Sequence, residues 1–430
     1  MIRIYNSNEV DIDRILSREQ ESVSAGVERA VDEIIENVRQ NGDAAVLSYV
    51  EKFDGVKLDS LKVTEEEIEE AYAFMDADFI RTLELAYENI YAFHEKQVRK
   101  DFVVNEREGV VLGQKITPVE KAGLYVPGGT ASYPSSVLMD IVPAKIAGVS
   151  EIVITTPPGK DGKINPAILA AAKVAGATSI FKTGGAGAIA ALAYGTKSIP
   201  KVDKIVGPGN IFVATAKRKV FGLVSIDMIA GPSEILVIAD DTANPKFVAA
   251  DLLSQAEHDK LSSAVLVCTS ASLAERVAEE VEAQLQTLPR QEIARASIEN
   301  NGMIVVMNTL AEAVEVSNKI APEHLELCVD EPFGLLNSVK NAGSIFLGKN
   351  VPEALGDYFA GPNHTLPTAG TARFSSPLSV DDFIKKSSFI YYTKDALREV
   401  KDRVVDFAGR EGLHAHGRSI SVRFENEEKE

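Results

Sequence analysis

Cysteine is scarce in this 430-residue sequence, which contains only Cys268 and Cys328. A disulfide framework is therefore excluded as the main source of stability. Both cysteines lie in apolar runs, SAVLVCT and LELCVD, which are typical of buried strands. Because a thiolate would be costly in such a core, we expect these thiols to serve packing rather than covalent catalysis.

Long apolar runs are also missing. No stretch approaches the roughly 18 consecutive apolar residues of a membrane-spanning helix. The first residues, MIRIYNSNEVD, have neither the basic nor the apolar region of a secretory signal peptide. These features predict a soluble, cytoplasmic protein with no membrane partner.

Positive charge is in deficit, with 45 Lys and Arg against 63 Asp and Glu, so the net charge is −18. A protein built to neutralise phosphates is expected to be basic, which argues against a nucleic acid partner. Apolar residues make up 45% of the chain and charged residues 25%, which are ordinary globular values. The length predicts about two to four domains.

The pattern of hydrophobic residues changes near residue 120. Residues 20–100 have helical spacing of apolar residues, including a capping-box pattern at Thr64 and Glu67. Beyond them, β-rich runs such as EIVIT and SEILVIAD alternate with helical runs. Such alternation predicts parallel sheets covered by helices, in two Rossmann-like α/β blocks at about 120–232 and 233–350. The last segment, from about 380, reads as helices laid over another surface, with one possible strand at SISVRF and a disordered tail, ENEEKE.

Five of the six histidines follow residue 250, which narrows the search for chemistry. Gln255 and His258 lie in the expected helix DLLSQAEHDK, where residues three apart share a face, although so short a motif also fits a solvated surface. Glu323 and His324 precede a strand in APEHLEL. An adjacent acid and base at a strand edge can divide proton-transfer duties, whereas the alternative is an exposed polar turn.

Two further clusters lie nearer the C-terminus. Asp357 and His364 belong to GDYFAGPNHTLPTAGTARFSS, which reads as a long loop of the functional kind. Glu411, His414 and His416 follow in EGLHAHGRS, where at most one of the two histidines is expected to point into a given site. Amide, carboxylate and imidazole donors without a thiolate suit zinc or another divalent first-row metal.

Glycine-rich turns follow several expected strands. TGGAGAIAALAYG (183–195) approximates a dinucleotide-binding loop through Gly185, Gly187 and Ala190, with Asp203 as a candidate for the acidic residue of that motif. A tight strand–helix turn would need the same glycines, so the two interpretations remain open. YVPGGTASYPSS and VGPGN are two more such turns, and together they predict a crevice lined by loops.

Taken together, these segments resemble the histidinol dehydrogenase family over residues 20–424. The resemblance is carried by LYVPGG, GGAGAIAALAYGT, KVDKIVGPGN, AGPSEILVIAD, DLLSQAEHD, APEHLEL, GPNHTLPT and EGLHAH, in that order. It implies a zinc-dependent enzyme that oxidises L-histidinol through the aldehyde to L-histidine with two NAD, as the last step of histidine biosynthesis.

The resemblance also implies roles for particular residues. The implied zinc ligands are Gln255, His258, Asp357 and His416. The implied acid–base pair is Glu323 and His324. The implied substrate contacts, besides the pair and the ligands, are Ser233, His364 and Glu411. The implied cofactor contacts are Tyr125, Asn210 and Gly187, and the last is often Gln in the family, so a side-chain contact is lost here.

In that family the chain forms homodimers with swapped C-terminal segments, so Glu411 and His416 are expected to serve the partner's active site. The implied domains are an N-terminal arm (1–19), a discontinuous α/β domain with N-terminal helices (20–122 plus 233–378), a second Rossmann-like domain (123–232) and a swapped segment (379–430). Three alternatives remain open: a zinc- and NAD-dependent dehydrogenase of another small polar alcohol, a metal-dependent hydrolase and a non-enzymatic nucleotide-binding module.

Overall fold

A computed structural model describes residues 1–7, 24–128 and 133–425. The chain divides into two compact units. Unit 1 comprises residues 1–98 and 119–383, and unit 2 comprises 99–118 and 384–430. None of the helices in the described ranges has the length and apolar character needed to cross a bilayer.

The first sheet of unit 1 has five parallel strands in the order β6-β5-β4-β7-β8. Its strands are β4 (Lys121–Tyr125), β5 (Glu151–Thr156), β6 (Ser179–Lys182), β7 (Lys204–Val206) and β8 (Ser225–Ile226). The helices that connect them are α6 (Pro134–Ala147), α7 (Pro166–Ala175), α8 (Gly185–Tyr194) and α9 (Ile211–Val220). Local signals set their ends: in α7, the Asn165 side chain accepts the Ala167 N–H, and Gly176 ends the helix in a left-handed conformation.

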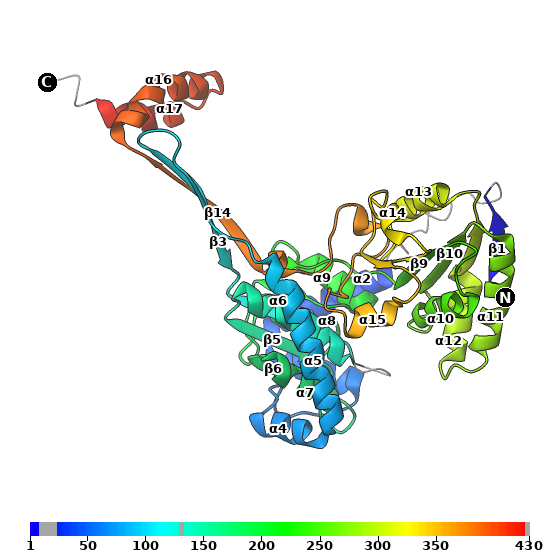
Figure 1. The fold of residues 1–430 in the computed structure, drawn as a ribbon. Coiled ribbons are helices and arrows are strands. Elements are labelled where there is room, and N and C mark those ends of the chain that lie inside the picture. Colours follow the sequence, from blue (N-terminus) through cyan, green and yellow to red (C-terminus); the bar gives the residue numbers. More distant parts are fainter. Residues whose placement is uncertain (8–23, 129–132, 426–430) are drawn as a thin grey trace. The chain divides into compact units, whose positions relative to one another are not determined.

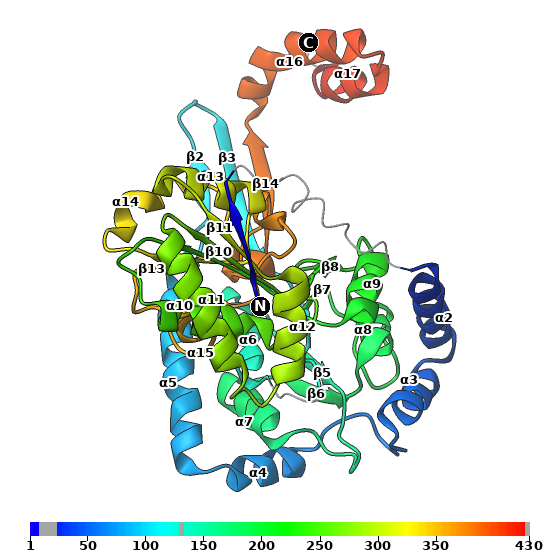
Figure 2. The ribbon, with the colours of Figure 1, turned by 90° about the vertical axis from the view of Figure 1, so that its right-hand side faces the viewer.

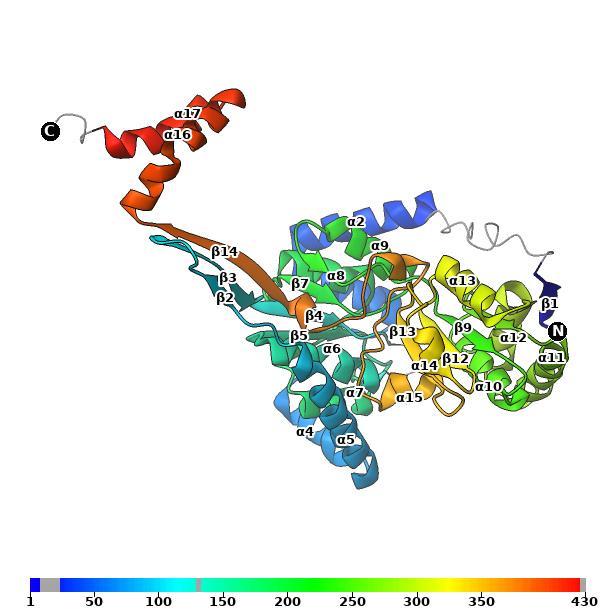
Figure 3. The same cartoon turned by 45° about the horizontal axis from the view of Figure 1, so that its top comes forward.

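The N-terminal helices pack on this first sheet's layer. They are α2 (Ala25–Asn41), α3 (Asp43–Tyr49), α4 (Glu65–Phe74) and α5 (Ala77–His94). Helix α2 lies beside α8 and α9 (Figure 3), α4 contacts α7, and α5 contacts α6. The capping box predicted at Thr64 and Glu67 is confirmed, because each side chain accepts the other residue's backbone N–H. Residues 20–122 were expected to group with the second α/β block. Instead, the apolar faces of helices α2 to α5 contribute to the core of the first sheet.

The second sheet has six parallel strands in the order β1-β11-β10-β9-β12-β13. They are β1 (Arg3–Asn6), β9 (Glu234–Ala239), β10 (Ser263–Cys268), β11 (Met303–Val306), β12 (His324–Cys328) and β13 (Ser344–Leu347). Helices α10 (Pro245–Ala256), α11 (Ala271–Leu285) and α12 (Gln291–Asn301) cover one face, and Figure 2 shows them grouped in front of the strands. Helix α13 (Leu310–Ile320) covers the other face, and α14 (Pro332–Leu336) and α15 (Glu353–Tyr358) follow β12 and β13. The start of the predicted N-terminal arm is therefore the edge strand β1, and residues 8–23 of that region lie outside the described ranges.

Both sheets have the strand order of a Rossmann-like half, in which the third, second, first, fourth and fifth strands are neighbours. The predicted fold class of two Rossmann-like parallel sheets is confirmed. In each sheet the order reverses between the first and fourth strands, at β4 and β7 in one and at β9 and β12 in the other. These two switch points are where the candidate residues gather.

Unit 2 contains a three-stranded antiparallel sheet in the order β14-β3-β2 and two helices. The elements are β2 (Phe102–Val104), β3 (Val110–Pro118), β14 (Ile384–Tyr392), α16 (Lys394–Arg410) and α17 (His414–Ser421) (Figure 1). The predicted placement of a strand at SISVRF was wrong, because residues 419–424 are helical and the strand is β14. Nearly all of β14 is exposed, so its sequence lacks the apolar alternation by which a strand is recognised. The exchange of this segment between subunits stays a prediction.

Candidate active site

The site lies at the amino ends of β9 and β12 in the second sheet. A crossover helix runs antiparallel to the strands it connects, so the last turn of α10 returns to the edge where β9 and β12 begin. Gln255 lies in that last turn, and His324 is the first residue of β12. The fold therefore brings together Gln255 and His324, which are 69 positions apart in the sequence.

Gln255 is fully buried at this edge. Its side-chain Nε2 donates to the backbone carbonyl of Glu234, at 3.1 Å, and lies 3.0 Å from His324 Nδ1. Its Oε1 has no hydrogen-bond partner within the described part of the chain. A buried amide oxygen without a partner is uncommon in proteins, and it marks this atom as available for a ligand.

His324 is buried among acidic side chains. Its Nδ1 lies 3.0 Å from the Glu234 carbonyl, and its Nε2 lies 3.5 Å from Asp357 Oδ1 and 4.0 Å from Glu353 Oε1. Burial opposes charge on the ring, but the carboxylates of Glu353, Glu323 and Asp357 outweigh it and raise the pKa of His324 well above its usual range. When Nδ1–H donates to the Glu234 carbonyl, Nε2 is the nitrogen left to exchange a proton.

Glu323 is buried beside His324. Its Oε2 accepts the Glu234 backbone N–H at 2.8 Å and lies 3.7 Å from His324 Nδ1. Burial raises the pKa of this carboxyl to about 8 despite the nearby imidazole. Glu323 is therefore a stronger base than an exposed glutamate, which suits proton abstraction near neutral pH.

Asp357 and Glu353 project from one face of α15, four residues apart. The predicted loop at Asp357 was wrong, because this residue lies on that short helix. Burial alone would raise the pKa of Asp357, but its hydrogen bond to His324 and the charges of three histidines lower it below its usual range. One ligand atom from each of His324, Glu353 and Asp357 lies within 4.8 Å of the others.

His364 borders this cluster with both ring nitrogens engaged. Its Nδ1 lies 2.9 Å from the Asp357 backbone carbonyl, and its Nε2 lies 3.1 Å from the Ser136 hydroxyl. His364 thus holds Asp357 in place from the predicted loop. Ser233 is half-buried immediately before β9, next to Glu234.

The other predicted metal ligands are distributed over both units. His258 lies two residues beyond the end of α10, so the expected shared helical face with Gln255 was wrong, and its side chain is exposed. Asp357 and His324 nevertheless lie near enough to contribute to the electrostatic potential at His258. Glu411 and His416 belong to unit 2, where Glu411 follows the last residue of α16 and His416 is exposed on α17.

The residues of unit 1 fit a divalent cation. The unpartnered Gln255 Oε1 and the buried carboxylates of Asp357 and Glu353 supply the oxygen donors that such ions accept, with imidazoles close by. Burial raises the pKa of Glu323 and of Glu353 to about 8, so these carboxyls hold protons near neutral pH that a bound cation would displace.

The second switch point, at the carboxyl edge of the first sheet, holds the predicted cofactor residues. Tyr125 ends β4, and its hydroxyl accepts the Gly185 N–H at 3.2 Å. A Cβ at Gly207 would lie 2.2 Å from the Tyr125 carbonyl, and Gly207 has φ +109°, so only glycine allows this close approach. The Asn210 side chain accepts the N–H groups of the first turn of α9, and Gly187 is buried in α8 beneath Tyr49.

A buried ion pair fixes the Gly207 loop. Lys217 and Asp227 are both almost fully buried and form a salt bridge. Lys217 Nζ donates to the Gly207 carbonyl at 2.9 Å, and Asp227 Oδ2 accepts the Gly207 N–H at 2.8 Å. The glycine turn is therefore held on both sides, which keeps its edge preorganised for a ligand.

The sequence interpretation missed Glu234, Glu353 and Ser136. Glu353 had a readable signal, since it precedes Asp357 by four residues in a run that allows a helix. Glu234 acts through its backbone N–H and carbonyl, which carry no sequence signal, and Ser136 comes from a distant helix. The predicted packing roles of the cysteines agree with their burial, which raises the pKa of Cys268 to about 11 and that of Cys328 further.

Comparisons with known proteins agree with this geometry. The family model for histidinol dehydrogenase matches residues 16–424. The chain belongs to the histidinol dehydrogenase family. It is 58% identical to a histidinol dehydrogenase of Bacillus cereus over 415 residues, 96% of each chain, and 56% identical to that of Clostridium acetobutylicum over 427 residues, 99% of each chain.

A solved structure leads to the same family. The crystal structure of histidinol dehydrogenase from Elizabethkingia anophelis matches with a TM-score of 0.94 and 39% identity, covering 99% of this chain and 98% of that one. The predicted enzyme class, an NAD-dependent dehydrogenase, is confirmed. A hydrolase or a non-enzymatic nucleotide-binding module is not favoured.

Proposed function

We propose that this enzyme is a zinc-dependent histidinol dehydrogenase that oxidises L-histidinol through L-histidinaldehyde to L-histidine with two NAD, the last step of histidine biosynthesis. The observation that carries the proposal is the buried edge where Gln255, whose Oε1 has no partner among the described residues, contacts His324, and His324 in turn lies 3.5 Å from Asp357. An acid–base pair and a set of metal donors are thereby joined in one place.

Within the proposal, zinc is held by Gln255, His258, Asp357 and His416. The first three lie in unit 1, and His416 is assigned to the other subunit of a homodimer, together with Glu411 as a substrate contact. A zinc ion held by these residues would supply a Lewis acid able to bind the amine and imidazole nitrogens of the substrate. Asp357 and the other donors would thereby orient the alcohol carbon.

In the first oxidation, neutral His324 accepts at Nε2 the proton of the substrate hydroxyl while the adjacent C–H bond breaks and its hydrogen leaves as hydride. A cation bound beside Asp357 would lower the pKa of the ring and so favour this neutral form. The ring is held for this task by Glu234, whose carbonyl lies 3.0 Å from Nδ1. NAD supplies the hydride acceptor in both oxidations, and two molecules are consumed. The product of this step is the aldehyde, and the proton remains on His324.

In the second oxidation, Glu323 accepts a proton from water, whose oxygen forms a bond to the aldehyde carbon. The proton held on His324 passes to the former carbonyl oxygen, which gives the hydrate. The pKa of about 8 suits Glu323 to this work, and the Glu234 N–H fixes its carboxyl. After His324 has released its first proton, it accepts one from a hydrate hydroxyl as the second hydride leaves, which gives the carboxylic acid.

Ser233, His364 and Glu411 complete the substrate site in this proposal. His364 holds the Asp357 backbone through Nδ1, so its effect on substrate passes in part through a metal ligand. Glu411 is suited to pair with a cationic amine or an imidazole N–H.

NAD is assigned to Tyr125, Gly187 and Asn210 at the carboxyl edge of the first sheet. The support is the position of this edge at a switch point of a Rossmann-like sheet, where dinucleotides bind. The same proposal includes a homodimer that exchanges the C-terminal segment, residues 379–430. It also includes a cytoplasmic location.

The test is NADH formation followed spectrophotometrically with L-histidinol, before and after removal of metal and after zinc is restored. We expect two NADH per histidinol, loss of turnover in metal-free protein and its return with zinc. A matched amino alcohol that lacks the imidazole distinguishes this function from a dehydrogenase of other small polar alcohols. Full turnover of histidinol by demonstrably metal-free protein, or faster turnover of the second alcohol, would contradict the proposal.

A further inference from the structure

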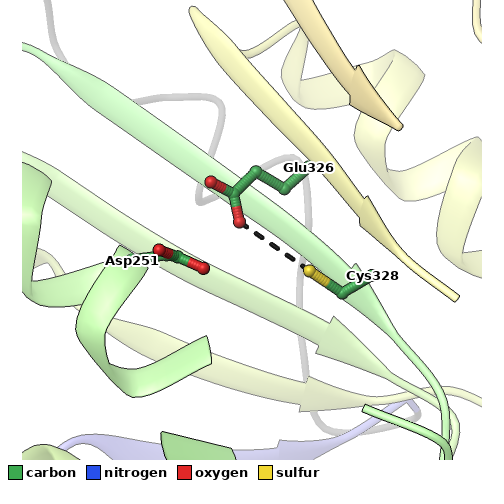
Figure 4. A group of neighbouring side chains, drawn as sticks. All are labelled: Asp251, Glu326 and Cys328. Carbon is green, nitrogen blue, oxygen red and sulfur yellow. Dashed lines mark hydrogen bonds between the residues drawn. The ribbon is translucent and has the colours of Figure 1, made fainter. Parts of the chain in front are cut away.

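A second buried acidic group lies behind the site and has no role in the chemistry described above. It consists of Asp251, Glu326 and Cys328, and one ligand atom of each lies within 4.8 Å of the others (Figure 4). Asp251 comes from α10, and Glu326 and Cys328 come from β12. We call Asp251 and Glu326 the carboxyl pair.

The carboxyl pair is close-packed and is hydrogen-bonded to its surroundings. An oxygen of Asp251 and an oxygen of Glu326 lie within 4.8 Å of each other, and one proton held between the two carboxyls would join them. Glu326 Oε1 accepts the backbone N–H of Glu353 at 2.9 Å, and Oε2 accepts the Cys328 thiol at 3.8 Å. Burial raises the pKa of both carboxyls, to about 6 for Asp251, so a shared proton is the stable state.

Each element joined by these bonds also carries a residue of the active site at a matching spacing. Asp251 precedes Gln255 by four residues on α10. Glu326 follows His324 by two residues on β12, and side chains two apart in a strand share a face. The third element is α15, whose first residue, Glu353, donates its backbone N–H to Glu326 and which carries Asp357 one turn later.

We propose that Asp251 and Glu326 are positioning residues that tie α10, β12 and α15 together and so set the relative positions of Gln255, His324 and Asp357. The inference rests on the proposed metal site in naming Gln255 and Asp357 as ligands. The pair itself touches none of the reacting atoms. Its bonds hold the backbones of α10, β12 and α15 in place. Each bond lies one helical turn or two strand residues away from Gln255, His324 or Asp357.

The test compares zinc affinity, measured by competition with a chelator, among variants that do or do not keep the bond to Glu326. Asp251→Ala removes the bond and leaves the Glu326 carboxylate without that partner, so we expect at least a tenfold loss of zinc affinity. Asp251→Asn can donate its amide N–H to Glu326, so we expect affinity within threefold of wild type. The absorption spectrum of the cobalt-substituted protein should change for Ala and not for Asn.

Gln284→Ala is the matched control. It breaks a hydrogen bond of 3.0 Å from α11 to the Lys246 carbonyl at the start of α10, without touching β12 or α15. This variant should lose thermal stability but keep zinc affinity and the cobalt spectrum. If Asp251→Ala is insoluble, Glu326→Gln is tested instead. The glutamine amide can still accept the Glu353 N–H and can donate to Asp251. This variant should therefore bind zinc within threefold of wild type.

Unchanged affinity in Asp251→Ala, equal losses in the Ala and Asn variants, or a tenfold loss in Glu326→Gln would each overturn the positioning role. Failure of the proposed function looks different, because the wild-type protein itself would then bind no zinc at this site. Normal zinc binding by the wild type with no effect of Asp251→Ala removes only the inference about the carboxyl pair.

Discussion

The buried carboxyl of Asp140 allows a quantitative test of how burial of a polar group near the site affects the free energy of unfolding. This residue is fully buried on α6. Its Oδ1 accepts the Thr365 hydroxyl at 3.0 Å, next to His364, which we propose contacts substrate, and its Oδ2 has no hydrogen-bond partner among the described residues. Burial, reinforced by the charge of Asp227, raises the pKa of Asp140 from 3.8 to about 8.

The sign of the resulting pH dependence follows from this direction. Below pH 3.8 the carboxyl is protonated in both the folded and the unfolded chain, and ionisation changes nothing. Between pH 3.8 and about 8 the unfolded chain releases the proton and the folded chain keeps it, so the free energy of unfolding falls as pH rises. At about 1.36 kcal/mol per unit, the loss reaches roughly 1–2 kcal/mol at pH 5 and about 4 kcal/mol at pH 7.

Asp140→Asn removes the ionisation and keeps the shape, because the amide nitrogen takes the place of the protonated Oδ2. We therefore expect the variant to be more stable than wild type at pH 7, with an advantage that is roughly 2–3 kcal/mol larger than at pH 5. Urea unfolding of metal-free protein, followed by circular dichroism at both pH values, measures this difference. Asp78→Asn, on the exposed first turn of α5, controls for the loss of one negative charge.

An advantage of equal size at pH 5 and pH 7 would refute the reasoning, since it would mean that Asp140 does not hold a proton in the folded chain. A variant less stable than wild type at pH 7 would refute it more directly. The position of His364 should not change in Asp140→Asn, because the amide oxygen of Asn still accepts the Thr365 hydroxyl.

Further predictions concern the site and its support. His258→Asn should lose zinc together with activity, as measured by metal analysis and NADH formation, and retention of full zinc content would exclude His258 as a ligand. His324→Asn should suppress both oxidations with zinc still bound, whereas Glu323→Gln should mainly slow oxidation of supplied aldehyde, by roughly 10²–10⁴-fold; a Gln variant that slowed only alcohol oxidation would reverse the assignment. Co-refolding His258→Asn with His416→Asn should restore up to about one quarter of wild-type activity if sites are shared between subunits, and no recovery in confirmed mixed dimers would show that each subunit builds its own site. Lys217→Met should lower the free energy of unfolding by about 3–5 kcal/mol, because it leaves the buried carboxylate of Asp227 without its partner; a change under about 1 kcal/mol in denaturant unfolding would contradict that role.

Local pattern was enough to predict much of the fold. Strands such as β5 and β9 are short runs of β-branched residues, and helices such as α7 begin and end at residues with clear capping chemistry. The alternation of the two predicts parallel sheets because a crossover helix is the short way to join parallel strands. The strand β14 escaped prediction because it is exposed on both faces and therefore lacks alternation.

The candidate site was predictable as a set of residue types and as a family resemblance, but not as a place. By itself, the sequence determined the Rossmann-like elements, the glycine turns and the candidates for the acid–base and donor roles, because propensity, capping and motif are local properties of the chain. Only the tertiary structure brought α10, β12 and α15 to one edge, placed α2–α5 on the first sheet rather than the second, and added Glu353 and the backbone of Glu234 to the site. The physical reason is that contact and burial depend on which segments pack together, and the packed residues lie up to 90 positions apart in the sequence. That packing shifts the pKa of Glu323 and His324 and leaves Gln255 Oε1 without a partner among the described residues.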